Sequence, residues 1–186
     1  ALRMEGRTLV PIDIFSECAR RFESDAECQL ALGTAYEARV FSSVPYAGAF
    51  GWQPSTAPVP NNARAGLQAK NAYERALRLV PELDEAHLRF GRFLQRRGEA
   101  KRAEQELTWV LEHSTTAHYR VLAHLFLGRM AENRERFRDA AAHYRAALQE
   151  QPTCQAARLA RSHALLRAGQ HREAMETARS TLHAPD

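Results

Sequence analysis

Long apolar runs are absent from this sequence of 186 residues. No segment approaches the roughly 18–20 uninterrupted apolar residues that a membrane-spanning helix needs, and residues 1–10 contain no apolar run typical of a signal peptide. These absences predict a soluble chain and favour the cytoplasm as its location. The chain begins with Ala1 and not with Met, so a removed leader or a longer parent protein stays open, and with it the compartment.

Cysteine is scarce, with only Cys18, Cys28 and Cys154. Three cysteines cannot all pair within one chain, and their spacing shows no C-x-x-C pattern of metal ligands. All three fall in segments with helical spacing of apolar residues, where free cysteine acts as a small hydrophobic residue. We therefore expect no disulfide framework.

Lysine is also nearly absent. Of the 26 basic residues only Lys70 and Lys101 are lysine, which leaves 26 − 2 = 24 arginines, although the net charge is only +4. One interpretation is a genome whose codon usage favours arginine. The other is selection for guanidinium groups, which bind carboxylates and phosphates through two parallel hydrogen bonds. The placement of the arginines has to decide between them.

Common catalytic motifs are missing as well: the sequence has no Gly-rich phosphate loop, no H-E-x-x-H, no nucleophile elbow and no C-x-x-C. We therefore predict that the chain is not an enzyme and needs no cofactor. His87 and His124 stand 124 − 87 = 37 residues apart, in places where they could approach each other. Because no Asp, Glu or Cys joins them at ligand spacing, we interpret them as packing residues and predict no metal site.

Acidic residues interrupt most of the helical segments. A surface that binds nucleic acid usually carries dense basic stripes with interleaved aromatic residues. Here carboxylates break up such stripes, which argues against nucleic acid as the partner; an example is the segment with Glu99, Glu104, Glu106 and Glu112.

What the sequence does contain is an internal repeat. The pair Leu127-Gly128 aligns with Phe90-Gly91 at an offset of 128 − 91 = 37, and Ala140 aligns with Ala174 at an offset of 34. A period near 34 with this alternation of small and large apolar residues resembles the tetratricopeptide repeat, a helix-turn-helix unit. The clearest copy runs from Val121 to Pro152.

This resemblance implies an all-α fold, a right-handed superhelix of stacked antiparallel helix pairs with about four repeats. Glycines in the middle of the first helices indicate close approach of two helices, because glycine costs about 1 kcal/mol there relative to alanine; they are Gly33, Gly91 and Gly128. The predicted single domain consists of a capping helix or remnant of a preceding repeat at 1–24, then repeats at 25–81, 82–116, 117–152 and 153–186.

The repeats depart from the family pattern in two respects. The large aromatic residue usual in the first helix is replaced at four positions, and Arg161-Ser162 stands where Leu-Gly is expected. The last repeat is therefore an atypical copy, as is common at the ends of repeat stacks. The four replacing residues are Gln29, His87, His124 and Arg158.

Residues 42–62 interrupt the first repeat. Four prolines exclude a continuous helix there; they are Pro45, Pro54, Pro58 and Pro60. The aromatic residues Tyr46, Phe50 and Trp52 argue against plain disorder. The insertion is either a loop folded back on its own repeat stack, a flap that contacts a partner, or a mobile segment.

In the family, ligands lie against the first helix of each unit. On that face, two rows of polar residues align across three repeats beside a row of leucines. The residues that we expect to contact a partner there are Leu88, Arg89, Arg92, Arg96, Leu125, Phe126, Arg129, Asn133, His163 and Arg167. Guanidinium groups on this face would select an acidic segment. The alternative interpretation is that arginine merely fills exposed helix positions.

The sequence can be compared with the binding site that the family uses for one well-known ligand. Co-chaperones of this family clamp a C-terminal carboxylate with Lys and Asn residues at fixed positions in three units. Neither register of this sequence carries the clamp; starting at the first unit, Leu30, Thr34 and Arg89 stand at its first three positions. The tail of a heat-shock protein is therefore a poor ligand for this chain.

The resemblance thus predicts a scaffold that binds a peptide or protein segment on its concave face. The alternative is a regulatory module of a larger enzyme whose catalytic domain lies outside these residues. A third interpretation is self-association, because a stack that ends near Leu182 without a polar capping helix would leave an apolar end face.

Overall fold

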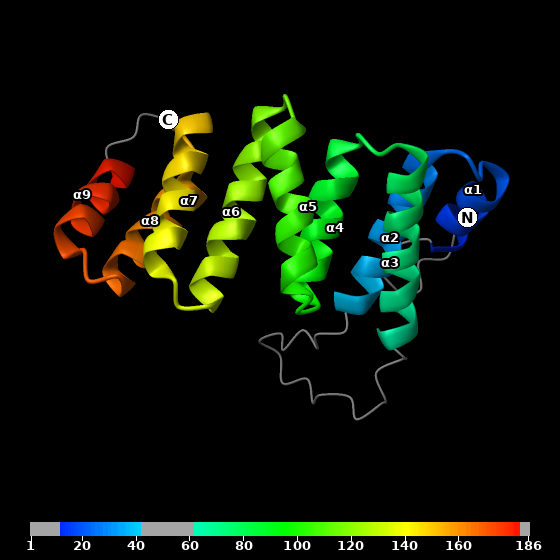
Figure 1. Ribbon diagram of the computed structural model, residues 1–186, viewed down its shortest axis with the longest axis horizontal. Coiled ribbons are helices and arrows are strands. Elements are labelled where there is room, and N and C mark those ends of the chain that lie inside the picture. Colours follow the sequence, from blue (N-terminus) through cyan, green and yellow to red (C-terminus); the bar gives the residue numbers. More distant parts are fainter. Residues whose placement is uncertain (1–11, 42–61, 183–186) are drawn as a thin grey trace, which may run out of the picture. The chain divides into compact units, whose positions relative to one another are not determined.

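The computed structural model describes residues 12–41 and 62–182, and in these ranges it contains nine α-helices and no strand (Figure 1). The predicted all-α class is confirmed. The chain divides into two compact units, residues 1–86 and 87–186, where the sequence predicts a single domain. A repeat protein is built mainly from contacts between neighbouring helices, so such a division is physically reasonable.

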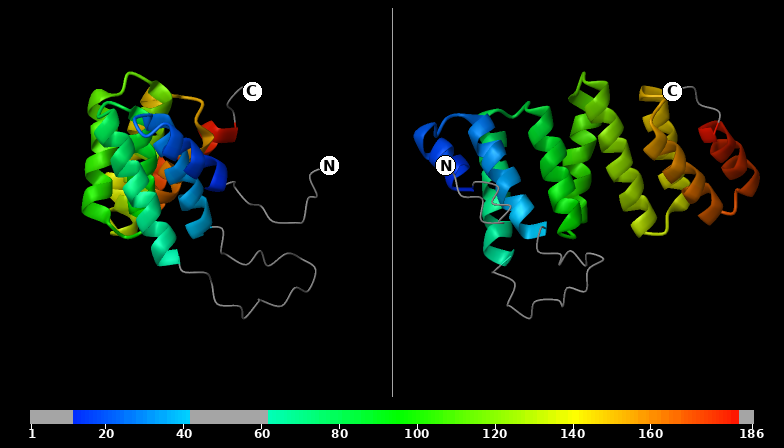
Figure 2. Two further views of the ribbon diagram at one scale, coloured as in Figure 1. Left: turned by 90° about the vertical axis from the view of Figure 1, so that its right-hand side faces the viewer. Right: turned by 180° about the vertical axis from the view of Figure 1, so that it is seen from behind.

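The first unit contains α1 (Ile12–Arg21), α2 (Ala26–Phe41) and α3 (Asn62–Leu79) (Figure 2). Helix α2 packs against both α1 and α3. The Asp25 carboxylate accepts hydrogen bonds from the backbone N–H groups of Glu27 at 2.8 Å and Cys28 at 3.2 Å, which satisfies the first turn of α2. The predicted insertion at 42–62 lies outside the described residues except for Asn62, where α3 begins.

Cys18 and Cys28 are joined by a disulfide, so the interpretation of all three cysteines as free, small apolar residues is wrong for these two. Cys18 lies in α1 and Cys28 lies in α2, and the chain turns back between the two helices, which brings their Cα atoms to 5.6 Å. That separation suits a disulfide. Cys154 is free and half-buried.

The second unit contains most of α4 (Asp84–Arg96) and then α5 (Ala100–His113), α6 (Ala117–Asn133), α7 (Phe137–Glu150), α8 (Gln155–Arg167) and α9 (His171–Leu182). Consecutive helices from α5 to α9 pack against each other in chain order, as the views from the front and from behind show (Figures 1 and 2). The pairs α4–α5, α6–α7 and α8–α9 correspond to the predicted repeats two, three and four.

The glycines of the first helices lie where two helices come close together. A Cβ atom on Gly128 would stand 2.5 Å from the Tyr144 ring, and one on Gly91 would stand 2.8 Å from the Leu107 side chain. In the fourth repeat Ser162 occupies the equivalent place, since 162 − 128 = 34. Its hydroxyl donates a hydrogen bond to the Ala174 carbonyl at 3.1 Å, which explains how this atypical repeat tolerates a side chain there.

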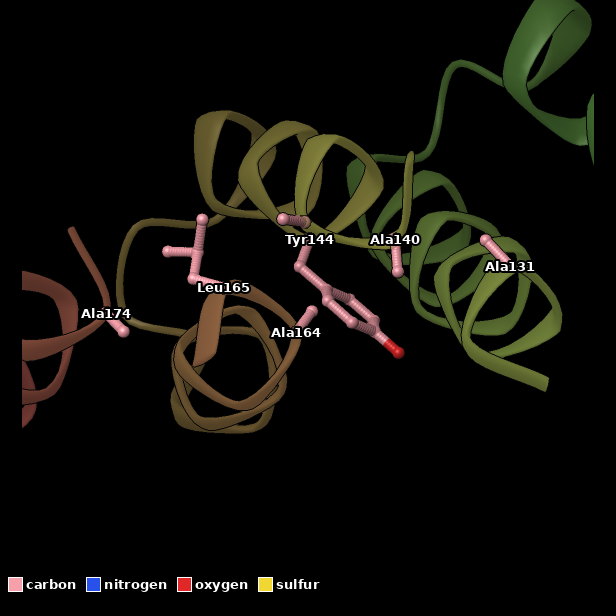
Figure 3. Close-up of a cluster of buried hydrophobic side chains, with 7 residues drawn as sticks. Ala131, Ala140, Tyr144, Ala164, Leu165 and Ala174 are labelled. Carbon is pink, nitrogen blue, oxygen red and sulfur yellow. The ribbon is translucent and has the colours of Figure 1, made fainter. Parts of the chain in front are cut away.

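Between the third and fourth repeats the core is built from small residues around one aromatic ring. The Tyr144 ring of α7 lies beside Ala164 of α8 and near Ala140 of its own helix (Figure 3). Tyr144 is only 2% exposed and both alanines are fully buried. Small side chains thus allow the helices to approach closely enough to enclose one large ring.

Candidate interaction surface

All ten predicted contact residues lie on the first helices α4, α6 and α8 of the second unit. They differ in exposure. Six are exposed, namely Arg92, Arg96, Arg129, Asn133, His163 and Arg167, whereas Arg89, Leu125 and Phe126 are half-buried and Leu88 is buried. The prediction thus places most of its residues on an accessible surface, and Leu88 in the core.

The aligned leucines become more exposed along the stack. Leu88 is 5% exposed, Leu125 is half-buried, and Leu159 is 61% exposed. Leu125 packs against clusters that include residues of α8, which shows that the following repeat covers the leucine of the one before it. No described helix follows α9, so Leu159 has no such cover.

Two hydrogen bonds join the neighbouring first helices. The Gln95 side-chain amide of α4 donates to the Phe126 carbonyl of α6 at 3.3 Å. The Glu132 carboxylate of α6 lies 3.2 Å from the Nδ1 atom of His163 on α8. The side of α4, α6 and α8 that carries the predicted contact residues is therefore linked across the second unit, and we refer to it as the arginine face.

Glu132 also receives a hydrogen bond from the core, because the Tyr144 hydroxyl donates to its other oxygen at 2.9 Å. Burial raises the pKa of this hydroxyl, and the bond to Glu132 raises it further, so the phenol remains a donor at neutral pH. The carboxylate is fixed between Tyr144 and His163. Sequence reasoning placed Glu132 and Gln95 on the predicted face but did not select them; each follows a mid-helix glycine by four residues.

Positive charge dominates the arginine face. Five guanidinium groups outnumber its two carboxylates, Glu85 at the start of α4 and Glu132 on α6. The Arg167 guanidinium carbon lies 4.4 Å above the Phe137 ring centroid. Such stacking holds the guanidinium plane in place while its N–H groups stay available for an anion. The five arginines are Arg89, Arg92, Arg96, Arg129 and Arg167.

The secondary contact predicted at Tyr46, Phe50 and Trp52 lies outside the described residues. Within the described ranges no helix is long and apolar enough to cross a membrane.

Residues 133–186 match the family model of the tetratricopeptide repeat. This part of the chain therefore carries the repeat of that family. The match covers α7, α8 and α9, which include the atypical last repeat that sequence reasoning identified least directly. No curated protein matches the chain.

Several solved structures share the fold. MamA from Desulfovibrio magneticus RS-1 is 18% identical over 92% of this chain and 81% of its own, with a TM-score of 0.66. TTC0263, a thermophilic tetratricopeptide-repeat protein of Thermus thermophilus, is 21% identical over 83% and 71%, with a TM-score of 0.66. PilF of Pseudomonas aeruginosa is 12% identical over 92% and 66%, with a TM-score of 0.70.

These likenesses confirm a tetratricopeptide-like solenoid, which is the architecture of a protein-interaction scaffold. At identities this low they describe the fold and leave the partner to be inferred from the residues of this chain.

Proposed function

We propose that this chain is a non-catalytic scaffold whose arginine face binds an acidic segment of a partner protein. The observation that carries the proposal is the set of five arginines on three neighbouring first helices, where the central carboxylate of Glu132 is already held by Tyr144 and His163. A guanidinium group binds a carboxylate through two parallel hydrogen bonds, so a row of them favours Asp and Glu side chains.

The apolar part of the contact would come from Leu125 and Phe126. Both side chains are half-buried on α6, between the arginines of α4 and the residues of α8, so each still offers some surface. The Phe126 carbonyl is held by Gln95, which fixes the backbone at this point. A ligand with acidic residues around one or two apolar side chains would fit both chemical features. We expect the arginines to raise the association rate as well as the affinity and to make both depend on salt.

The proposal is tested with two fluorescent peptides, one in which Asp and Glu surround Leu and Phe, and one in which Lys replaces every acidic residue. The acidic peptide should bind and the basic peptide should not. The variant Arg92→Glu/Arg129→Glu should weaken the binding of the acidic peptide by about tenfold or more, which corresponds to ~1.4 kcal/mol. Titration at about 0.05 M and about 0.3 M salt should show the difference shrinking at the higher concentration.

The matched control is Arg138→Glu/Arg145→Glu. It makes the same change of net charge with two exposed arginines of α7, on the second helix of the third repeat. This control should bind the acidic peptide nearly as wild type does. Equal losses in both double variants would mean that net charge alone attracts the peptide, and the arginine face would then have no specific part in binding.

A further inference from the structure

Two histidines face each other between the helices of the third repeat. The Nδ1 atoms of His124 on α6 and His143 on α7 lie 3.4 Å apart, and the ring centroids are 5.7 Å apart with the planes inclined by 44°. Both side chains are half-buried. The pair lies between the two helices of a single repeat, and neither histidine belongs to the set of residues that forms the arginine face.

The preceding repeat shows how unusual this pair is. There His87 and Glu106 occupy the same two places, since 124 − 87 = 37 and 143 − 106 = 37, and the Nδ1 atom of His87 lies 2.7 Å from the Glu106 carboxylate. Sequence reasoning considered an approach of His87 to His124. The structure instead pairs each of them with a residue on the second helix of its own repeat. His87 contacts the Glu106 carboxylate, and His124 contacts the His143 imidazole.

The separation of the two nitrogens suits a shared metal ion. A tetrahedral divalent metal with bonds of about 2.0–2.1 Å to imidazole places two of its ligand nitrogens about 3.3–3.4 Å apart. The two rings can also share a hydrogen bond in which one neutral imidazole donates its N–H to the other, and N–H donors usually lie about 2.7–3.2 Å from their acceptor. The observed 3.4 Å is long for a hydrogen bond and equals the separation expected for two ligands of one tetrahedral metal.

The electrostatic surroundings keep both rings neutral. Burial lowers the pKa of His124, and the nearby His143 lowers it further; burial also lowers the pKa of His143. A neutral imidazole has a lone pair to donate, whereas a protonated one has none. The Glu150 carboxylate acts in the opposite direction and raises the pKa of His124. It accepts two hydrogen bonds from Arg120, at 3.0 Å and 2.6 Å.

We propose that His124 and His143 form a two-histidine binding site for a divalent transition metal ion. No group of three or more His, Cys, Asp or Glu side chains is arranged for a metal among the described residues, so water would complete the coordination. Among the divalent metals that bind imidazole, Zn²⁺ prefers the tetrahedral geometry that this separation suits, whereas Cu²⁺ and Ni²⁺ prefer square-planar or tetragonal sites. This site is independent of the proposed peptide binding.

The test uses the full chain without an affinity tag, stripped of metal and with its disulfide intact. Isothermal titration with Zn²⁺ should show one equivalent bound. His124→Gln and His143→Ala should each weaken binding at least tenfold. His113→Ala and His171→Ala, which remove exposed histidines elsewhere in the second unit, should leave binding within about twofold of wild type.

His124→Gln removes one proposed metal ligand and should leave the fold intact. Gln29 stands at the equivalent place in the first repeat, four residues before its glycine, and is buried there, so the fold accepts glutamine at this position. Saturating Zn²⁺ should raise the Tm of wild type and of the two control variants but not that of His124→Gln. Binding to His124→Gln within twofold of wild type, or no stoichiometric binding by wild type, would overturn the proposal.

Discussion

At the residue scale, one turn departs from its two counterparts. Gly98 and Gly169 end their helices with φ angles of 80° and 78°, whereas the equivalent position in the third repeat holds Glu135 with φ of 57°. In each turn the backbone N–H of the next residue donates to the carbonyl five positions earlier, at 2.9–3.0 Å; the donors are Glu99, Arg136 and Gln170. All three helices thus end in the same left-handed turn, but only one carries a side chain there.

We therefore predict that Glu135→Gly stabilises the protein. Relief of the left-handed conformation contributes about 1–2 kcal/mol, and the greater freedom of glycine in the unfolded chain offsets about 0.4–1 kcal/mol of it. The Tm should rise by about 1–4 °C. Arg136→Gly is the matched control, because Arg136 has φ of −85° and should gain nothing from the change. A lower Tm for Glu135→Gly would show that the glutamate side chain contributes more than its backbone costs.

The histidine pair gives stability a pH dependence even without metal. The pKa values of His124 and His143 lie below the ordinary value of 6.5 in the folded state. Below about pH 6.5 the unfolded chain takes up protons that the folded chain does not, so the free energy of unfolding falls as the pH decreases. The charged groups around the pair are Glu150, Arg120, Asp139, Glu104 and Arg136.

The measurement is thermal unfolding in metal-free buffer between about pH 7.5 and about pH 5.5. His124→Gln/His143→Gln should lose less stability over this range than wild type, because glutamine does not titrate. Parallel curves for the two proteins would mean that other groups account for the dependence.

At the element scale, the repeats use one pair of positions in two ways. In the first and third repeats a tyrosine of the second helix donates to a glutamate of the first, from Tyr73 to Glu37 at 2.7 Å and from Tyr144 to Glu132 at 2.9 Å. In the second repeat Leu107 replaces the tyrosine, and Gln95 stands at the place of the glutamate. With no tyrosine to bind, Gln95 reaches the next first helix instead.

The disulfide ties α1 to α2, and its loss should loosen the first unit. In the chain-entropy description, closing a loop of ten residues stabilises the folded state by about 2–3 kcal/mol. Cys18→Ser/Cys28→Ser should therefore show faster hydrogen exchange in α1 and a lower Tm, and reduction of wild type should have the same effect. Cys154→Ser, which removes the free cysteine, is the control. Unchanged exchange in α1 would show that packing alone holds it against α2.

This bond also bears on location. Disulfides persist in oxidising compartments and are rare in cytosolic proteins. The pairing of Cys18 with Cys28 thus weighs against the cytoplasmic location that the sequence favours.

The repeat pattern could be predicted from the sequence because it depends on local spacing. Mid-helix glycines face large side chains of the partner helix, so the pairs Gly91–Leu107 and Gly128–Tyr144 have the same spacing, which is visible without coordinates. Contacts set by the angle between helices could not be predicted in this way. The Cys18–Cys28 bond depends on how α1 turns onto α2, and the pairing of His124 with His143 depends on which faces of α6 and α7 meet.

At the scale of the whole molecule, the chain divides into two compact units, and the first repeat belongs mainly to the first of them. The ten predicted contact residues all belong to the second unit, which has its own buried clusters around Tyr144 and Val121. Three helix pairs are about the minimum number from which a repeat stack buries a continuous core. The second unit therefore contains both the candidate surface and enough repeats to support it.

A fragment of residues 82–186, which keeps α4 whole, should consequently fold by itself and bind peptide. We expect a helical circular dichroism spectrum, a cooperative thermal transition with a lower Tm than that of the full chain, and an affinity for the acidic peptide within about twofold of the full chain. The complementary fragment 1–81, with α1 and only one helix pair, should unfold at a lower temperature and should not bind the peptide. If 82–186 folds without binding, residues 1–81 contribute to the ligand site. If it does not fold, the first unit is required to complete the core of the second.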